Sequence, residues 1–252
     1  MNLSNKIRNT IIEIAKKSKE GHIPSSFSIV ELLLSIYSKE KKNNTFDPAC
    51  IVLSKGHATY AYYAFLYNIG FFDKLEIDTV GQLSSKYYGH LPYIHGDKRF
   101  QFGSGSLGHG LPFSIGLAHG AKISKKSNFF YCIVGDGELN EGTFWESLLL
   151  LQKLKITNLK VLIDCNRSSE RAIPIIDILK NLKSAFKELD FVKVNGHSVD
   201  TLVNSMSNIE KSQILLCETI KGYPISFMQN NFAWHHRTPN EDEIMRIKEE
   251  LR

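Results

Sequence analysis

Two oxygen-bearing side chains, each directly after an apolar segment, have the chemistry to share one divalent metal ion. Asp136 follows the apolar run Phe129 to Val134, and Asn166 follows the run Leu159 to Ile163. Carboxylate and amide oxygens are hard ligands that suit Mg²⁺, with Ca²⁺ as a substitute, and Mg²⁺ commonly completes its octahedron with phosphate oxygens and water. The pattern predicts a bound metal ion that coordinates a diphosphate.

The two apolar runs are predicted strands joined by a helix. Glu141 to Leu154 carries apolar residues at helical spacing, namely Phe144, Trp145, Leu148, Leu149, Leu151 and Leu154. A crossover of this length makes the strands parallel, so Asp136 and Asn166 meet at the sheet edge where open α/β sheets bind ligands. Gly135 and Gly137 let a ligand approach the backbone. Taken alone, Gly-Asp-Gly is also a common turn, with Asn166 capping the next segment.

Strands and helices alternate along the rest of the chain. This alternation predicts the α/β class, with one parallel sheet, helices on both of its faces and one domain over residues 1–252. We expect Gly21 to end the first helix, Ser28 to cap the second, and Phe72 to Gly103 to be irregular. The remaining predicted helices are Leu3–Lys19, Ile29–Tyr37, Ala58–Tyr67, Leu111–Ile123, Ile175–Phe186, Val199–Ile209 and one from Glu241, and the remaining strands are Cys50–Leu53, Phe191–Val194 and Ile214–Glu218.

The composition is that of an ordinary globular protein. Hydrophobic residues make up 42% and charged residues 23%, and the net charge of +5 is spread over lysine clusters interleaved with Glu or Ser. This pattern indicates solvated faces and argues against nucleic-acid binding. No run approaches the ~20 apolar residues of a membrane span, and the 4 cysteines lack metal-ligand spacing. We expect a cytoplasmic protein with buried, reduced thiols.

Several histidines lie where the chain passes between predicted elements. His22 lies between two helices and His57 between a strand and a helix, while His90 is in the irregular region and His235 near the carboxyl end. Each could face a cleft, but His22 could equally be a loop histidine bonded to a carbonyl, and His57 a helix cap. A glycine-rich turn, residues 103–110, precedes another helix and could cradle phosphate or only permit tight packing.

These motifs together resemble the transketolase family, which uses thiamine diphosphate and Mg²⁺. The matching stretches are EGHIPSSFSIVELLLSIY, DPACIVLSKGHATYAYYAFLYNIG, GSGSLGHG, GDGELNEGTFWES and ETIKGYPISFMQNNFAWHHRTPN. The sequence departs from the family pattern at Pro24, where glycine is frequent, and at His109, where glutamine is frequent. The resemblance implies that Mg²⁺ is bound by Asp136, Asn166 and the backbone carbonyl of Ser168.

The resemblance also implies roles for other residues of these motifs. His22 and His90 would border the substrate channel, and His235 would reach the diphosphate and the reacting carbon. The expected cofactor contacts are His57, Gly105, Leu107, Gly137, Glu138, Glu141, Asn166 and His235. For Glu141 a simpler alternative to a cofactor contact is that an acidic side chain stabilises the positive end of the helix dipole at a helix amino terminus.

The chain resembles only the family's first domain, which binds the diphosphate. In transketolases a separate pyrimidine-binding domain supplies a glutamate to the cofactor ring, and this sequence has no such half. We therefore expect the amino-terminal subunit of a split transketolase, inactive alone. Its partner would be a second chain with the pyrimidine-binding and carboxyl-terminal domains, in an α2β2 assembly, and its substrates sugars or sugar phosphates.

Three other functions share some of these features. The α subunit of a 2-oxoacid dehydrogenase or a deoxyxylulose-phosphate synthase would share the Gly-Asp-Gly motif and the asparagine. A degenerate, non-catalytic diphosphate-binding scaffold is opposed by the intact set of histidines and metal ligands. A nicotinamide-dependent oxidoreductase is disfavoured because no GxGxxG motif opens a strand-helix unit followed by a ribose-binding acid.

Overall fold

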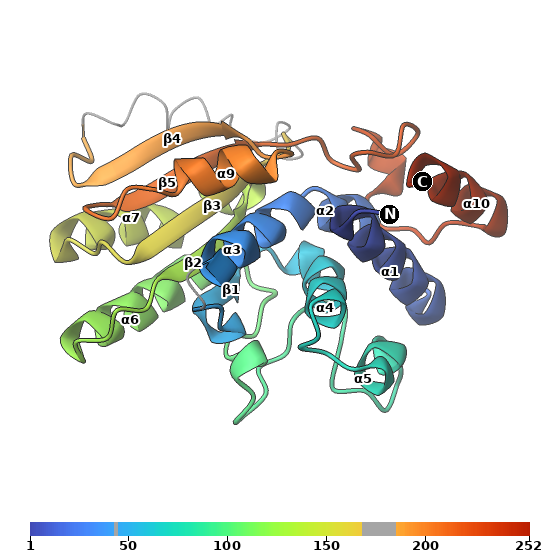
Figure 1. The fold of residues 1–252 in the computed structure, drawn as a ribbon, viewed down its shortest axis with the longest axis horizontal. Helices are drawn as coiled ribbons and strands as arrows, with labels where there is room; N and C mark the ends of the chain where they lie inside the picture. The colour runs from blue at the N-terminus through green and yellow to red at the C-terminus, as the bar shows by residue number, and fades with distance from the viewer. Residues whose placement is uncertain (43–44, 168–184) are drawn as a thin grey trace.

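A five-stranded parallel sheet forms the centre of the chain. The computed structural model describes residues 1–42, 45–167 and 185–252. The strands lie in the order β1-β2-β3-β5-β4, and all neighbouring pairs are parallel (Figure 1). Their bounds are β1 Ile51–Leu53, β2 Phe130–Gly135, β3 Leu159–Cys165, β4 Leu189–Asn195 and β5 Ser212–Glu218.

The two strands that precede the predicted metal ligands are interior neighbours. Every residue of β2 and β3 is buried, as expected for near-continuous apolar runs in a sheet covered on both faces. Gly135 at the end of β2 pairs with Asp164 near the end of β3. Asp136 and Asn166, which follow directly, therefore leave the sheet side by side at its carboxyl edge.

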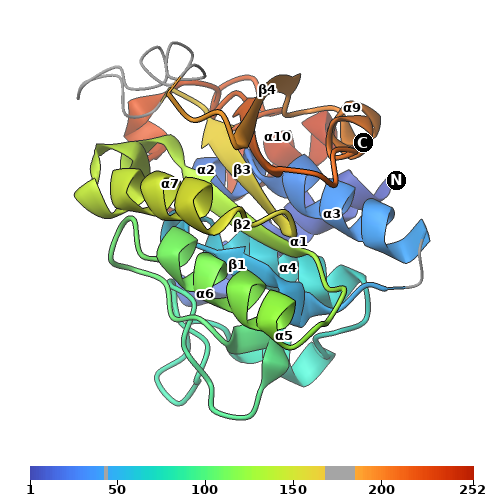
Figure 2. The same cartoon turned by 90° about the vertical axis from the view of Figure 1, so that its left-hand side faces the viewer.

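Helices cover both faces of the sheet, as the sequence predicted. On one face α6 (Gly110–Ile123) and α7 (Gly142–Leu154) pack over a core that includes Leu148 and Ile163. On the other face α3 (Val30–Lys42) and α9 (Val199–Ser205) contribute to a second core with α1 (Leu3–Ser18) and α4 (Thr59–Asn68). Figure 2 shows the α6–α7 pair and the α3–α9 pair on opposite sides of the strands.

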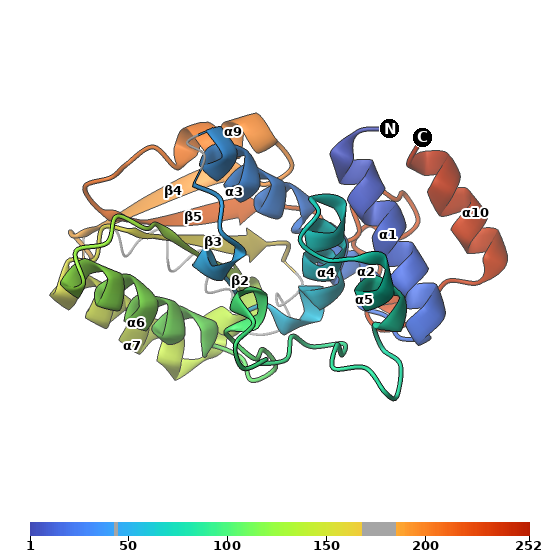
Figure 3. The ribbon, with the colours of Figure 1, turned by 60° about the horizontal axis from the view of Figure 1, so that its bottom comes forward.

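The first and last helices lie next to each other (Figures 1 and 3). The Asn5 side chain donates to the Leu251 carbonyl at 2.7 Å, and Lys248 pairs with Glu13 at 2.9 Å. The last helix, α10 (Glu241–Glu250), begins with a capping box in which Asn240 and Glu243 bond each other's backbone. The two ends of the described chain are thus packed together.

Several predicted details were wrong. Ser28 does not cap α3, because its hydroxyl donates instead to Asp164 on β3 at 2.6 Å. Gly21 does not end α1, which ends at Ser18 with Lys19 in the left-handed conformation; a Cβ at Gly21 would lie 2.2 Å from the Arg237 carbonyl oxygen. Leu149, expected on the buried face of α7, is 60% exposed.

Two short α-helices among the described residues were not predicted. Helix α2 (Ile23–Phe27) begins with Pro24 in its first turn, a position where proline is favoured because no N–H is needed. Helix α5 (Lys74–Thr79) lies in the stretch expected to be irregular and begins with a capping box formed by Asp73 and Glu76. The helix predicted at Ile175–Phe186 falls almost entirely outside the described residues.

Within the described ranges, no helix combines the length and the apolarity required to cross a membrane. All four cysteines are buried and none forms a disulfide.

Candidate functional site

A cleft opens at the carboxyl edge of the sheet, where β2 and β3 end. Seven of the residues selected from the sequence line this cleft, namely His57, Leu107, Asp136, Gly137, Glu138, Asn166 and His235. Three further lining residues, Ser25, Lys55 and Lys221, carry polar groups and were given no role from the sequence. The parallel crossover therefore brings together chain segments more than 100 residues apart.

A buried carboxylate beneath the cleft organises the proposed metal ligand Asn166. Asp164 is fully buried and accepts hydrogen bonds from four side chains, those of Ser28, Lys55, Asn166 and Thr219. The Asn166 Nδ2 atom lies 2.9 Å from Asp164 Oδ2. Because a carboxylate can only accept, the amide nitrogen faces Asp164 and the amide oxygen, Oδ1, is turned away from it.

The donor set at the two strand ends fits a small hard cation. Asp136 is buried and offers a carboxylate, and Asn166 offers the oxygen that its contact with Asp164 has oriented. A ligand whose other side is held by a hydrogen bond is the usual arrangement around protein metal sites. The third predicted ligand, Ser168, lies outside the described residues, and its role stays a prediction.

Two buried lysines supply positive charge to the same cleft. Lys55 forms an ion pair with Asp164 and also donates to the Ser25 carbonyl at 3.0 Å. The Lys221 ammonium lies 2.9 Å from Nδ1 of His235. Burial, together with the nearby Lys55 charge, lowers the pKa of Lys221 to about 8. An anionic ligand such as a diphosphate would relieve the repulsion between these cations.

Glu138 joins the turn that carries Asp136 to the glycine-rich loop. Its Oε1 accepts the Gly135 N–H at 2.8 Å, and its Oε2 accepts the Gly108 N–H at 2.9 Å and the Ser54 hydroxyl. Burial raises the pKa of this carboxyl above its ordinary value, although the three hydrogen bonds act in the opposite direction. Glu138 thus holds two loops in place, and its predicted contact with a cofactor stays a prediction.

The glycine-rich loop enters α6 beside the cleft. Gly105 has a φ of 146°, a conformation open to glycine and strained for other residues. Leu107 lines the cleft and is partly exposed, so its side chain is available to a ligand. Glu141 lies at the start of α7 and does not line the cleft. The cofactor contacts predicted for Gly105 and Glu141 stay predictions.

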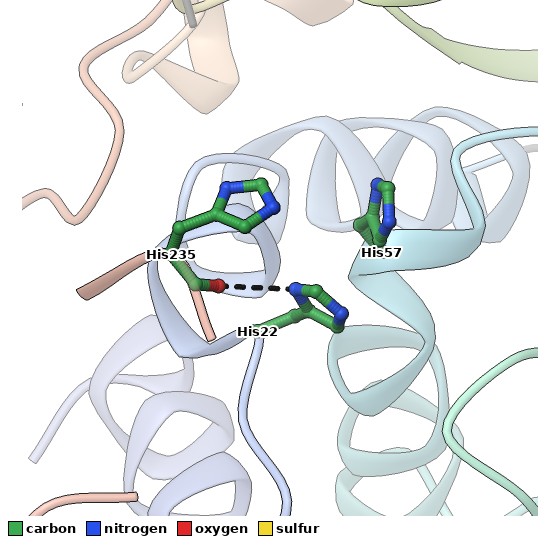
Figure 4. Close-up of side chains that lie close together, drawn as sticks. All are labelled: His22, His57 and His235. Atoms are coloured by element: carbon green, nitrogen blue, oxygen red, sulfur yellow. Dashed lines mark hydrogen bonds between the residues drawn. The ribbon is translucent and has the colours of Figure 1, made fainter. Parts of the chain in front are cut away.

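A cluster of histidines borders the cleft, and two of its members, His57 and His235, line it. One ring nitrogen from each of His22, His57 and His235 lies within 4.8 Å of the other two, and Figure 4 shows the three rings gathered from separate elements. The ring of His90 lies 5.5 Å from that of His57, and the ring of His236 lies 4.6 Å from that of His22. The four histidines selected from the sequence are thus brought together, and His236 joins them.

Hydrogen bonds fix which nitrogen of two rings carries the proton. His22 Nδ1 lies 3.0 Å from the backbone carbonyl of His235, which can only accept, so Nδ1 carries the hydrogen and Nε2 is an acceptor (Figure 4). The Lys221 ammonium donates to Nδ1 of His235, which places the hydrogen of that ring on Nε2. His22 therefore presents an acceptor, its Nε2 atom, and His235 presents a donor, its Nε2–H.

Burial and the neighbouring histidines keep the rings of His22 and His57 uncharged. The pKa of His22 is lowered to about 3, first by burial and then by His57 and His236. The pKa of His57 is lowered to about 4, first by burial and then by His90 and His235. Both side chains are neutral near pH 7, so each ring has one nitrogen that can donate a hydrogen bond to a substrate and one that can accept.

Comparisons with known proteins agree with this geometry. A family model described as the thiamine diphosphate binding domain of transketolase matches residues 1–252. The chain is 31% identical to one of the subunits of the apulose-4-phosphate transketolase of Actinobacillus succinogenes, over 97% of this chain and 92% of that protein. It is 29% identical to a 6-deoxy-6-sulfo-D-fructose transketolase subunit of a Clostridium species, over 95% of this chain and 91% of that protein.

Solved structures support the same fold. Transketolase from Campylobacter jejuni superposes with a TM-score of 0.83 at 22% identity, covering 100% of this chain and 43% of the other. This chain therefore spans less than half the length of that transketolase, whereas it is close in length to the two subunits. The resemblance that the sequence indicated is confirmed. The chain belongs to the transketolase family and matches its thiamine diphosphate binding domain.

Proposed function

We propose that this chain is the diphosphate-binding subunit of a two-chain transketolase that moves a two-carbon ketol unit from a ketose to an aldose. The observation that carries the proposal is the convergence of Asp136, Asn166 and two lysines in one cleft that the histidine cluster borders. Hard oxygen ligands suit Mg²⁺, ammonium groups suit a diphosphate, and imidazoles suit the hydroxyl groups of a sugar.

In this proposal Mg²⁺ is bound by Asp136, Asn166 and the backbone carbonyl of Ser168, and Lys221 and His57 face the diphosphate. Bound thiamine diphosphate supplies the nucleophilic carbon for the transfer. The acceptor nitrogen of His22 accepts a hydrogen bond from a sugar hydroxyl and orients it, and the Nε2–H of His235 donates to a developing oxyanion. His90, whose ring is next to that of His57, contacts the substrate.

The catalytic assembly in this proposal contains a second chain. That chain would carry the pyrimidine-binding domain and the carboxyl-terminal domain, with two copies of each chain in the assembly. The names of the two relatives of similar length, which both describe one part of a larger transketolase, support this division. Their names also suggest substrates to test first, namely apulose 4-phosphate and a 6-sulfonated ketose, besides common ketose phosphates.

Calorimetric titration of the purified chain with thiamine diphosphate tests the cofactor site. We expect binding that requires Mg²⁺ and is lost in Asp136→Ala; unchanged affinity in that variant would remove the proposed ligand. Ketol transfer, measured as the amount of aldose released, should appear only when the partner chain is added. Turnover by the purified chain alone would contradict the two-chain assignment, and oxidation of a 2-oxoacid by the pair would replace transketolase with the alternative class.

A further inference from the structure

A buried network outside the cleft ends at the segment that carries Lys221. His197 lies in the loop after β4, and its side chain is 11% exposed. Its Nε2 atom accepts the backbone N–H of Ile220 at 2.8 Å, and its ring stacks on Tyr223 with centroids 4.0 Å apart and planes 29° apart. One imidazole thus contacts the backbone just before Lys221 and a side chain just after it.

The hydrogen-bond partners of His197 fix which of its ring nitrogens carries the hydrogen. A backbone N–H can only donate, so Nε2 carries the lone pair and Nδ1 carries the hydrogen. Nδ1 faces Oε2 of Glu31 at 3.5 Å, and the same oxygen is paired with Arg8 at 2.7 Å. Although burial raises the pKa of Glu31, hydrogen bonds from His197 and the charge of Arg8 bring it below its ordinary value. The carboxylate therefore stays ionised and keeps the ring in one tautomer.

The backbone around Lys221 is held at other points as well. Thr219 donates its hydroxyl to Asp164, and the Gly222 N–H donates to the Pro24 carbonyl at 3.2 Å. The carbonyl of Lys221 accepts the Asn230 N–H at 3.0 Å. The backbone of Lys221 is thus fixed on each side, and its ammonium reaches the cleft beside His235.

We propose that His197 is a positioning residue for Lys221: by accepting the Ile220 N–H and stacking on Tyr223, it presents the Lys221 ammonium to the diphosphate of the cofactor. This inference rests on the proposed function, because it assumes that the cleft binds a diphosphate. His197 touches neither the cleft nor a reacting atom, and it acts only through the segment 219–223. Loss of its acceptor would leave a donor unsatisfied inside the protein and free the lysine segment to shift.

Two substitutions of His197 separate the contribution of its hydrogen-bond acceptor from that of its aromatic ring. His197→Phe keeps a flat ring over Tyr223 and removes the acceptor, whereas His197→Gln keeps an acceptor near the position of Nε2. Titrating the full chain with thiamine diphosphate in the presence of Mg²⁺, we expect roughly tenfold weaker binding for His197→Phe, in line with one unsatisfied buried donor. His197→Gln should restore most of the affinity, and the exposed His95→Phe should leave it unchanged.

A double-mutant cycle shows whether the effect passes through Lys221. If it does, adding His197→Phe to Lys221→Ala weakens binding no further than Lys221→Ala alone. Additive losses would overturn the inference, as would a His197→Phe chain that binds like the wild type. If His197→Phe does not fold, Tyr223→Leu removes the stacking partner and enters the same cycle. Failure of the wild type to bind thiamine diphosphate would instead contradict the proposed function.

Discussion

The side-chain amide of Asn166 donates a hydrogen bond to Oδ2 of Asp164, 2.9 Å away. Asp164 keeps three other donors without it, so Asn166→Ala should lower the thermal midpoint less than a change of Asp164 itself. The same variant loses a proposed metal ligand, and we expect the Mg²⁺-supported affinity for thiamine diphosphate to fall by more than about tenfold. Titration with Mg²⁺ at fixed cofactor measures this, and equal affinities in the two chains would exclude Asn166 as a ligand.

Asp164 itself should be far less tolerant of change than Asn166. In Asp164→Asn the buried ammonium of Lys55 loses its carboxylate, and breaking a buried ion pair on one side costs about 3–5 kcal/mol of unfolding free energy. Urea denaturation followed by circular dichroism measures the loss. The exposed Asp242→Asn is the matched control and should change stability by less than about 0.5 kcal/mol. A stable Asp164→Asn chain would show that Lys55 finds another partner.

Glu138 is expected to act mainly on stability and loop position. Glu138→Gln replaces one acceptor oxygen by an amide that cannot accept from Gly108 and Ser54, and we expect a loss of about 1–3 kcal/mol. Thermal unfolding of this variant is compared with that of Glu146→Gln, which changes an exposed glutamate on α7. If both variants unfold at the wild-type temperature, the loop bonds of Glu138 contribute nothing measurable.

The histidine cluster predicts loss of stability in acid. In the unfolded chain His22 and His57 take up protons as the pH falls below about 6.5, whereas in the folded chain their pKa values are about 3 and about 4. The unfolded state therefore binds more protons across this window, and the free energy of unfolding decreases as the pH falls from 7 toward 4.

Removing one ring of the cluster should flatten this dependence. Melting temperatures of the wild type and of His57→Asn, measured at intervals from about pH 7.5 to about pH 4.5, should diverge, with the variant falling less steeply. The exposed His95→Asn should parallel the wild type. Identical slopes for all three chains would mean that His57 does not keep a lowered pKa in the folded protein.

Local sequence patterns were sufficient to predict the sheet and the edge at which Asp136 and Asn166 meet. The apolar runs before Asp136 and Asn166 predicted two parallel strands, and the structure places their ends side by side. The helix between them was also predicted to within one residue of its observed start, Gly142. These features depend on short-range periodicity and on the handedness of the crossover, which a single sequence contains.

Contacts between distant segments could not be predicted in the same way. Ser28 has the residue type of a helix cap, but its hydroxyl bonds Asp164, 136 positions away. Lys55 and Lys221 are common surface residues by type, and only the folded sheet shows that both enter the cleft. Leu149 fits the apolar spacing of α7, yet it faces outward.

The position of β2 and β3 inside the sheet, with β1 and β5 on either side, has a consequence for the time scale of motion at the site. Backbone amides of interior strands exchange with deuterium only when the whole sheet opens, whereas those of peripheral helices such as α10 exchange through local fraying. Exchange measured by mass spectrometry should therefore find the strand tips that bear Asp136 and Asn166 among the slowest parts of the chain, already rigid before any ligand arrives.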